Sequence, residues 1–266
     1  STPLYSSAAS DVYKRQKKMP IASRTHQFDE ITYKVDGLKV KALQMCPLTK
    51  TVKRIVVYLR GGKGQVGRVR AARLMQFAND NTLVVGPYYR GSNGSEGRDE
   101  FANADLKDVT YLIKILKQRF PNAYIHMIGF SRGGIQGLLT YQDYPVDSYI
   151  IWGGVSSMHL MYEERTDLRG MLRRMVGHPS KNKESYDQRD AIKLIDSNSP
   201  PILIVHGGKD KQVGIHHANY LEEQLKLKGV VHDTFYQLDE GHVPRPQAMK
   251  LALDYVHQWM TKCEEI

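Results

Sequence analysis

The feature that most constrains the fold is a series of continuous apolar runs separated by stretches with helical periodicity. Runs of this kind, rich in β-branched residues, are typical of parallel strands buried on both faces. Between two runs, apolar residues recur on one helical face from Leu106 to Leu116, and Asp105 and Asp108 fall in its first turn, where the helix dipole favours acids. The alternation predicts an α/β protein with a mostly parallel, doubly wound sheet. The runs are "RIVVYL" at 54–59, "TLVVG" at 82–86, "AYIHMIGF" at 123–130, "YIIWGG" at 149–154 and "PILIVHGG" at 201–208.

Two segments depart from this alternation. Residues 31–46 predict an antiparallel N-terminal hairpin of two short strands, because the Asp36-Gly37 pair between them is a strong hairpin signal. Residues 156–190 are too long for an ordinary connection and predict a small helical insertion. In such sheets ligands bind beyond the carboxyl ends of the strands, so the insertion is expected to overhang the site. The length of 266 residues and the hydrophobic content of 41% fit one domain over residues 19–266.

The chain contains no feature of a secreted or membrane protein. Residues 1–16 have neither a signal-peptide core nor a helical period, so we expect a non-native or disordered tail over residues 1–18. No run approaches the roughly 18 consecutive apolar residues of a membrane span. The two cysteines, Cys46 and Cys263, match neither a disulfide framework nor a metal-ligand spacing. These features predict a cytoplasmic protein with no membrane partner.

A net charge of +10 raises the question of nucleic-acid binding, because basic clusters release phosphate counterions. Residues 1–18 contribute +3 of this charge, and the remaining bases are scattered among acids without an aromatic-flanked stripe. A solvated basic surface is the better interpretation, and no nucleic-acid partner is expected. A metal site at His216 and His217 is not expected either, since adjacent helical side chains point about 100° apart. We expect no metal and no other cofactor.

The sharpest motif is "MIGFSRGG" at 127–134, in which Gly129 to Gly133 fit the pattern Gly-x-Ser-x-Gly. It follows a predicted strand and precedes a helical run. This is the context of a nucleophile elbow, a strained turn that exposes a serine hydroxyl close to a helix N-terminus. The motif therefore predicts Ser131 as the nucleophile of an α/β-hydrolase fold.

A serine nucleophile needs a base, and the base needs an acid that orients it. In hydrolases with this elbow the chain order is serine, then acid, then histidine. Asp210 follows the strand "PILIVHGG", and His242 follows the next strand, so both are expected at the carboxyl edge of the sheet. These positions predict a Ser131, Asp210, His242 triad. The nearest competitors are His206, which we interpret as structural, and Asp239 and Glu240, which lie too close to His242 in sequence to orient it easily.

The glycine-rich segment "RGGKGQVGR" at 60–68 resembles a phosphate-binding loop at first sight. The match fails, because Arg68 and Val69 stand where that loop needs a lysine and a hydroxyl. Acyl transfer instead needs an oxyanion hole, with one N–H from the residue after the nucleophile, here Arg132, and another from the loop after an earlier strand. We therefore assign the second donor to the loop at Gly61 and Gly62.

Together with "YYRGSNGSEGRDEFANADLKDV" at 88–109, these motifs resemble the catalytic domain of the prolyl oligopeptidase family of α/β-hydrolases. The likeness covers nearly all of residues 50–262, including Arg90-Gly91-Ser92, the elbow, "HGGKDKQV" and the "EGH" at 240–242. The resemblance implies that Ser131 is the nucleophile, Asp210 the orienting acid and His242 the general base and then general acid.

The chain departs from that family in two respects. Its peptidases usually carry a large β-propeller that admits only short peptides, and no propeller is expected within this sequence. Their oxyanion hole often uses a tyrosine hydroxyl just before the paired glycines, where this chain has Arg60. Backbone N–H groups near Gly61 and Gly62, or the Arg60 guanidinium, are the replacements we consider.

The predicted function is a serine hydrolase that cleaves an ester or a small amide or peptide bond through an acyl-enzyme intermediate. Its expected partner is a small ester or short peptide substrate. One alternative is an oligopeptidase or aminopeptidase without the gating propeller. Another is a non-catalytic binding protein on a hydrolase scaffold, since a fold does not fix function.

Overall fold

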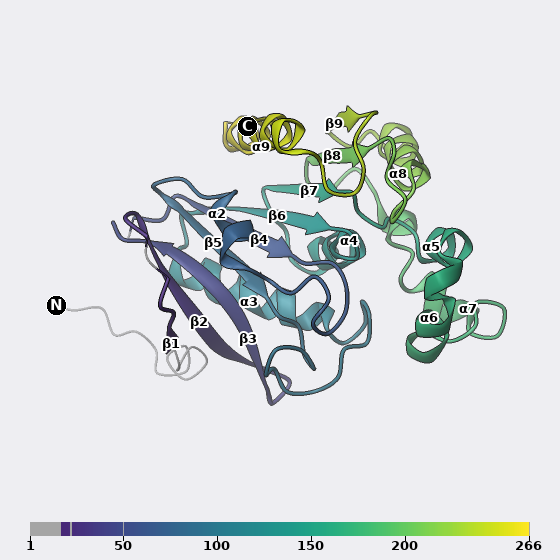
Figure 1. Ribbon diagram of the computed structural model, residues 1–266, viewed down its shortest axis with the longest axis horizontal. Coiled ribbons are helices and arrows are strands. Elements are labelled where there is room, and N and C mark those ends of the chain that lie inside the picture. The colour runs from purple at the N-terminus through teal and green to yellow at the C-terminus, as the bar shows by residue number, and fades with distance from the viewer. Residues whose placement is uncertain (1–16, 22, 50, 266) are drawn as a thin grey trace.

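The computed structural model describes residues 17–21, 23–49 and 51–265, which form one sheet flanked by helices (Figure 1). The strand order is β1-β2-β3-β5-β4-β6-β7-β8-β9. Strands β4 to β9 run parallel, while β1, β2 and β3 are antiparallel and join the sheet through β5. This confirms the predicted α/β fold class. The strands are β1 (Lys17–Lys18), β2 (His26–Val35), β3 (Leu38–Pro47), β4 (Arg54–Leu59), β5 (Thr82–Pro87), β6 (Tyr124–Phe130), β7 (Ser148–Trp152), β8 (Ile202–Gly207) and β9 (His232–Gln237).

The N-terminal hairpin of β2 and β3 is antiparallel, as its turn sequence predicts. Val35 pairs with Leu38, so only Asp36 and Gly37 form the turn. Both have positive φ, 50° and 83°, which is the conformation of a type I′ hairpin turn. Each strand is ten residues long, and the hairpin therefore extends further in both directions than the predicted 31–46.

Helices cover both faces of the sheet because successive strand residues point to opposite sides. In β4, Ile55, Val57 and Leu59 pack in one core cluster and Val56 and Tyr58 in another. The first cluster contains residues of α3 (Leu106–Arg119), α4 (Gly133–Asp143) and α8 (Ile215–Leu227), and the second contains residues of α2 (Ala71–Met75) and α9 (Pro246–Glu264).

Residues 156–190, where we predict an insertion, contain short helices. In Figure 1 they lie on the side to which the arrowheads of β4, β6 and β7 point. Ser157 caps the first helix, since its Oγ accepts a hydrogen bond from the Leu160 N–H at 3.4 Å. The elements are α5 (Met158–Glu164), a 3-10 turn (Thr166–Leu168), α6 (Arg169–Met175) and α7 (Lys183–Asp187), followed by a second 3-10 turn (Ala191–Leu194).

The predicted tail of residues 1–18 falls mostly outside the described residues. Its last two residues, Lys17 and Lys18, form β1 and pair with Glu30 and Asp29 of β2. The boundary of the tail at residue 18 stays a prediction. Among the residues that the structure describes, no helix has the length and apolar character needed to cross a bilayer.

Candidate active site

Ser131 lies in a tight turn between β6 and α4. Its φ of 56° is strained for a residue with a side chain, as expected of a nucleophile elbow. The Ser131 carbonyl oxygen accepts backbone hydrogen bonds from Gly134 and Val155, both at 2.9 Å, which hold the turn. A Cβ atom on Gly133 would come within 2.0 Å of the Leu59 carbonyl oxygen, so only glycine lets α4 start this close to β4.

Asp210 and His242, which come from the loops after β8 and β9, form a hydrogen-bonded pair. The His242 Nδ1 atom lies 2.7 Å from Asp210 Oδ2. The other carboxylate oxygen, Oδ1, accepts hydrogen bonds from the N–H groups of Gln212 at 2.8 Å and Val213 at 2.9 Å. Burial acts to raise the pKa of Asp210, but the hydrogen bonds from His242 and these N–H groups outweigh it and the pKa is lowered. Asp210 is therefore ionised at neutral pH and fixes the orientation of His242.

The competing residues have other partners. Asp239 is exposed and its carboxylate lies 2.7 Å from Lys209 Nζ. Glu240 binds the Arg245 backbone N–H and its guanidinium instead of a histidine. His206 is buried and its Nε2 donates to the Val213 carbonyl oxygen at 2.8 Å. Burial lowers the pKa of His206, which fits a neutral ring with a structural role.

Ser131 and His242 line the same pocket, which has a volume of about 550 Å³. Within the described part of the chain the structure contains no hydrogen bond between them. Catalytic hydrogen bonds are often long without substrate and tighten when it binds. Because His242 Nδ1 bonds to Asp210, Nε2 is the ring atom left to exchange a proton. The His242 ring packs against Phe130, with 4.7 Å between the ring centroids.

The glycine-rich loop after β4 lies directly against the elbow. A Cβ atom built on Gly61 would come within 2.7 Å of Ser131 Cβ and 3.2 Å of Ser131 Oγ, so a side chain there would collide with the serine. Gly61, Gly62 and Arg132 all line the pocket. The loop can therefore bring its backbone to the carbonyl carbon that Ser131 Oγ would attack.

The guanidinium of Arg60 is fully buried behind this loop and does not line the pocket. Its Nη1 donates to the carbonyl oxygens of Gly61 at 3.0 Å and Val66 at 3.1 Å. Its Nη2 donates to the Tyr88 carbonyl oxygen at 3.2 Å and to Ser92 Oγ at 2.9 Å. Arg60 thus holds the glycine loop from behind, and the backbone of the loop is what faces the pocket.

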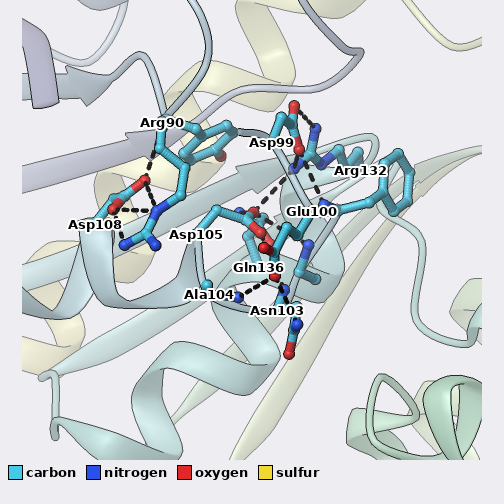
Figure 2. Close-up of polar contacts among 12 residues, drawn as sticks. Arg90, Asp99, Glu100, Asn103, Ala104, Asp105, Asp108, Arg132 and Gln136 are labelled. Atoms are coloured by element: carbon cyan, nitrogen blue, oxygen red, sulfur yellow. Dashed lines mark hydrogen bonds and ion pairs between the residues drawn. The ribbon is translucent and has the colours of Figure 1, made fainter. Parts of the chain in front are cut away.

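The residue after Ser131 anchors a buried polar network, drawn in Figure 2. The Arg132 guanidinium binds both Asp99 oxygens at 2.7 Å and Asp105 Oδ2 at 3.0 Å. Its Nη1 also donates to the Gly62 carbonyl oxygen at 3.1 Å, which ties the elbow to the glycine loop. Phe101, in the strained 99–105 loop with a φ of 56°, stacks on the guanidinium at 4.3 Å.

Of the two acids at the start of α3, Asp105 belongs to this network and Asp108 forms a separate pair, which changes one sequence-based interpretation. Asp105 and Asp108 were expected to act through the helix dipole. Asp105 instead accepts hydrogen bonds from Arg132 and from Gln136 Nε2 at 2.7 Å. Asp108 forms an ion pair with Arg90 at 2.7 Å (Figure 2). Burial raises the pKa of Asp108 to about 6, although Arg90 opposes the shift.

His217 connects α8 to the start of the insertion. Its Nδ1 accepts the Ser156 backbone N–H at 3.1 Å, an arrangement that needs the neutral ring. Burial and the nearby His206 and His216 lower the pKa of His217 to about 3. Among the described residues, no three side chains of the metal-ligating types lie close enough together to hold an ion.

The buried neutral state of His217 predicts acid-sensitive stability. The unfolded histidine has a pKa near 6.5, so between pH 6.5 and about 3 the unfolded chain binds a proton that the folded chain does not. The free energy of unfolding should therefore fall as pH drops through this window, by up to about 1.4 kcal/mol per pH unit from this residue. Urea unfolding at pH 7.5 and pH 5.5 measures the difference. In His217→Gln, which keeps a neutral hydrogen-bond acceptor, we expect the free energy of unfolding to differ less between the two pH values. The same difference as in the parent protein would contradict the neutral state of His217.

The sheet, the elbow and the Asp210–His242 pair define an α/β-hydrolase. Residues 69–265 match the prolyl oligopeptidase family. The chain is 38% identical over 251 residues to the uncharacterized peptidase YtmA of Bacillus subtilis, covering 92% of this chain and 97% of YtmA. The chain belongs to the prolyl oligopeptidase family and is an enzyme of the serine hydrolase class, as the sequence motifs predict.

Two solved structures show the same fold at low sequence identity. The acylaminoacyl peptidase of Pyrococcus horikoshii matches with a TM-score of 0.75 and 17% identity, over 91% of this chain. The present chain spans only 42% of that peptidase chain. Acetyl xylan esterase 1 of Thermoanaerobacterium matches with a TM-score of 0.68 and 16% identity, over 90% of this chain and 86% of the esterase.

Proposed function

We propose that the protein hydrolyses an ester or a small amide through an acyl-enzyme on Ser131. The observation that carries this proposal is that His242, which lines the same pocket as the strained Ser131, forms a 2.7 Å hydrogen bond with Asp210. His242 acts as general base and then general acid, and Asp210 orients it. The oxyanion donors are the Arg132 backbone N–H and the backbone of the loop at Gly61 and Gly62.

In the first half-reaction, Ser131 Oγ attacks the substrate carbonyl carbon and its proton passes to His242 Nε2. The carbonyl oxygen becomes an oxyanion, which the backbone N–H groups stabilise. When the bond to the leaving group breaks, Nε2 returns the proton to that group. In the second half-reaction, water gives a proton to Nε2 and attacks the acyl carbon, and the carboxylic acid leaves as Ser131 Oγ regains a proton.

We expect ester cleavage to exceed amide cleavage. The reason is Arg60, whose position holds a tyrosine donor in many members of the family but whose guanidinium here is bound to loop carbonyl oxygens. An amide leaving group is harder to expel and depends more on a complete oxyanion hole. The alternative is an oligopeptidase or aminopeptidase, which the name of the relative YtmA favours because it is called a peptidase.

The test is kcat/KM on an ester and an amide that share the same acyl group, with leaving groups matched in size. Preferential ester cleavage supports an esterase built on a peptidase-like domain. Efficient cleavage of short peptide amides would establish the peptidase alternative. Failure to hydrolyse any activated ester, combined with no labelling by a fluorophosphonate, would overturn the proposed function itself.

A further inference from the structure

The pocket at Ser131 is lined by basic side chains. Among the described residues that line it none is acidic, whereas six carry a positive charge: Lys63, Arg68, Arg70, Arg73, Arg132 and Arg165. Two of the six are neutralised, since Arg132 binds Asp99 and Asp105 and Arg165 binds Asp167. For the other four, no carboxylate partner exists within the described part of the chain. A pocket with unpaired cations and no acid favours an anionic ligand and disfavours a cationic one.

The four cations without a carboxylate partner come from one short stretch of chain, and one of them, Arg73, donates from Nη1 to the uncharged Gln76 Oε1 at 2.8 Å. Lys63, Arg68 and Arg70 are exposed on the loop after β4 and just before α2, and Arg73 is half-buried in α2. They form one wall of the pocket, which we call the basic wall. The insertion supplies apolar side chains of the pocket lining, among them Met161, Leu168 and Met171. The pocket thus offers separate places for a charged and an apolar part of a substrate.

The basic wall reaches the His242 side of the pocket. The Arg73 guanidinium lies 5.2 Å from the centre of the Phe130 ring, and His242 packs against the same ring with 4.7 Å between the ring centroids. His242 is the group that would protonate the leaving group, so side chains next to it face the leaving group and not the acyl group. Arginine is well suited to binding a carboxylate, because its planar guanidinium can donate two parallel hydrogen bonds to the two carboxylate oxygens.

We propose that the basic wall, with Arg73 as its innermost member, binds a carboxylate on the leaving-group side of the scissile bond. The preferred substrate then joins an apolar acyl group to an alcohol or amine that carries a negative charge. This inference rests on the proposed function, because it assigns the substrate class of the same Ser131 site. Lys63, Arg68 and Arg70 attract the anion toward the pocket, and Arg73 meets it close to the reacting bond.

The experiment compares two pairs of esters. In the first pair, meta-acetoxybenzoate and meta-acetoxybenzamide, the charge is present or absent on the leaving group. In the second pair, the para-nitrophenyl esters of 4-carboxybenzoic acid and 4-carbamoylbenzoic acid, it is present or absent on the acyl group. Each kcat/KM is divided by the rate of hydroxide-catalysed hydrolysis, so that differences in intrinsic reactivity cancel. We expect a preference of about ten- to a hundredfold for the carboxylate in the first pair, as for a hydrogen bond to a charged group, and none in the second.

Two arginine variants test whether Arg73 is the residue that binds the carboxylate. Arg73→Gln should reduce the carboxylate preference about tenfold, whereas Arg174→Gln, an exposed arginine of α6 outside the pocket lining, should retain it. If Arg73→Gln does not fold, product inhibition of the parent enzyme tests the carboxylate site instead. We expect meta-hydroxybenzoate to inhibit more strongly than meta-hydroxybenzamide, and equal inhibition would overturn the site. Raising the ionic strength should weaken the preference by screening the exposed cations.

The outcomes separate this inference from the proposed function. Ester hydrolysis with equal rates for both members of the first pair overturns the anionic leaving group and leaves the serine hydrolase assignment intact. A carboxylate preference confined to the second pair overturns the placement on the His242 side. An equal preference in Arg73→Gln and the parent overturns the role of Arg73. If no ester is hydrolysed and a fluorophosphonate does not label the protein, the proposed function fails and this inference fails with it.

Discussion

Replacing Ser131 with alanine should lower kcat for any ester substrate by about 10⁴- to 10⁶-fold, which is the scale of losing the nucleophile of a serine hydrolase. The change removes one oxygen atom from a turn that backbone hydrogen bonds already hold, so stability should change little. The oxyanion donors and the pocket remain, and substrate binding should largely persist. Initial rates on an activated ester, together with substrate binding by titration, measure both effects.

A fluorophosphonate probe provides an independent readout, since it reacts with an activated serine. The parent enzyme should be labelled at Ser131, and Ser131→Ala should not be labelled. The matched control is Ser180→Ala, in the loop between α6 and α7, where the hydroxyl contacts only His178 at 2.8 Å among the described residues. This control should retain both labelling and turnover. Turnover of Ser131→Ala at the parental rate would show that another residue is the nucleophile.

The elements of the sheet were predictable because their local pattern and their final environment agree. In "RIVVYL" every residue is buried, and β4 spans the predicted residues Arg54–Leu59. The hairpin turn was predictable for the same reason, since Asp36-Gly37 favours the positive φ values that the turn needs. The separate helices of the insertion were not predictable from the sequence. Their boundaries depend on how the helices pack against one another, as the burial of Leu172 and Tyr186 illustrates.

The site was predictable where a local motif marks it and unpredictable where contacts link distant segments. Ser131, Asp210 and His242 follow one another in the chain order that is typical of hydrolases with this elbow, and the sequence shows that order directly. The structure places Asp210 and His242 in contact. The network of Arg132 with Asp99 and Asp105 joins residues 27 and more positions apart, and no local pattern reveals it. The helical pattern pointed to Asp105 only as a favourable charge at the start of a helix, and Asp99 appeared only within the segment that resembles the family.

The orientation of Arg60 required the structure for a different reason. From the sequence, the second oxyanion donor was assigned to the loop backbone, and the Arg60 guanidinium stayed open as another candidate. A fully buried guanidinium must satisfy its own N–H groups, and the nearest acceptors are the carbonyl oxygens of Gly61, Val66 and Tyr88. To form these hydrogen bonds, the Arg60 side chain points toward the loop.

The net charge of the chain did not reveal the basic wall. The wall depends on where four cations lie, at one pocket, and the net charge carries no information on position.

Replacing Asp210 with asparagine should lower kcat by up to about 10⁴-fold while KM changes little, as the Ser-His-Asp mechanism implies. The reason lies in the hydrogen bonds of the carboxylate. Oδ1 accepts the N–H groups of Gln212 and Val213, so an asparagine must turn its carbonyl oxygen toward them. Its NH₂ group then points to His242 Nδ1 and forces that nitrogen to accept. The ring proton moves to Nε2, and Nε2 loses the lone pair that should take the Ser131 proton.

The matched control is Asp239→Asn, which makes the same chemical change three positions before His242. Asp239 is exposed and pairs with Lys209, so this variant should keep nearly full kcat. Fluorophosphonate labelling separates a catalytic from a structural effect, because Asp210→Asn should react slowly at Ser131 while its thermal unfolding still shows a folded protein. The pair of variants therefore tests the assignment of the acid directly. A large loss in Asp239→Asn with normal turnover in Asp210→Asn would transfer the orienting role to Asp239, and the 2.7 Å contact between Asp210 and His242 would have to be purely structural.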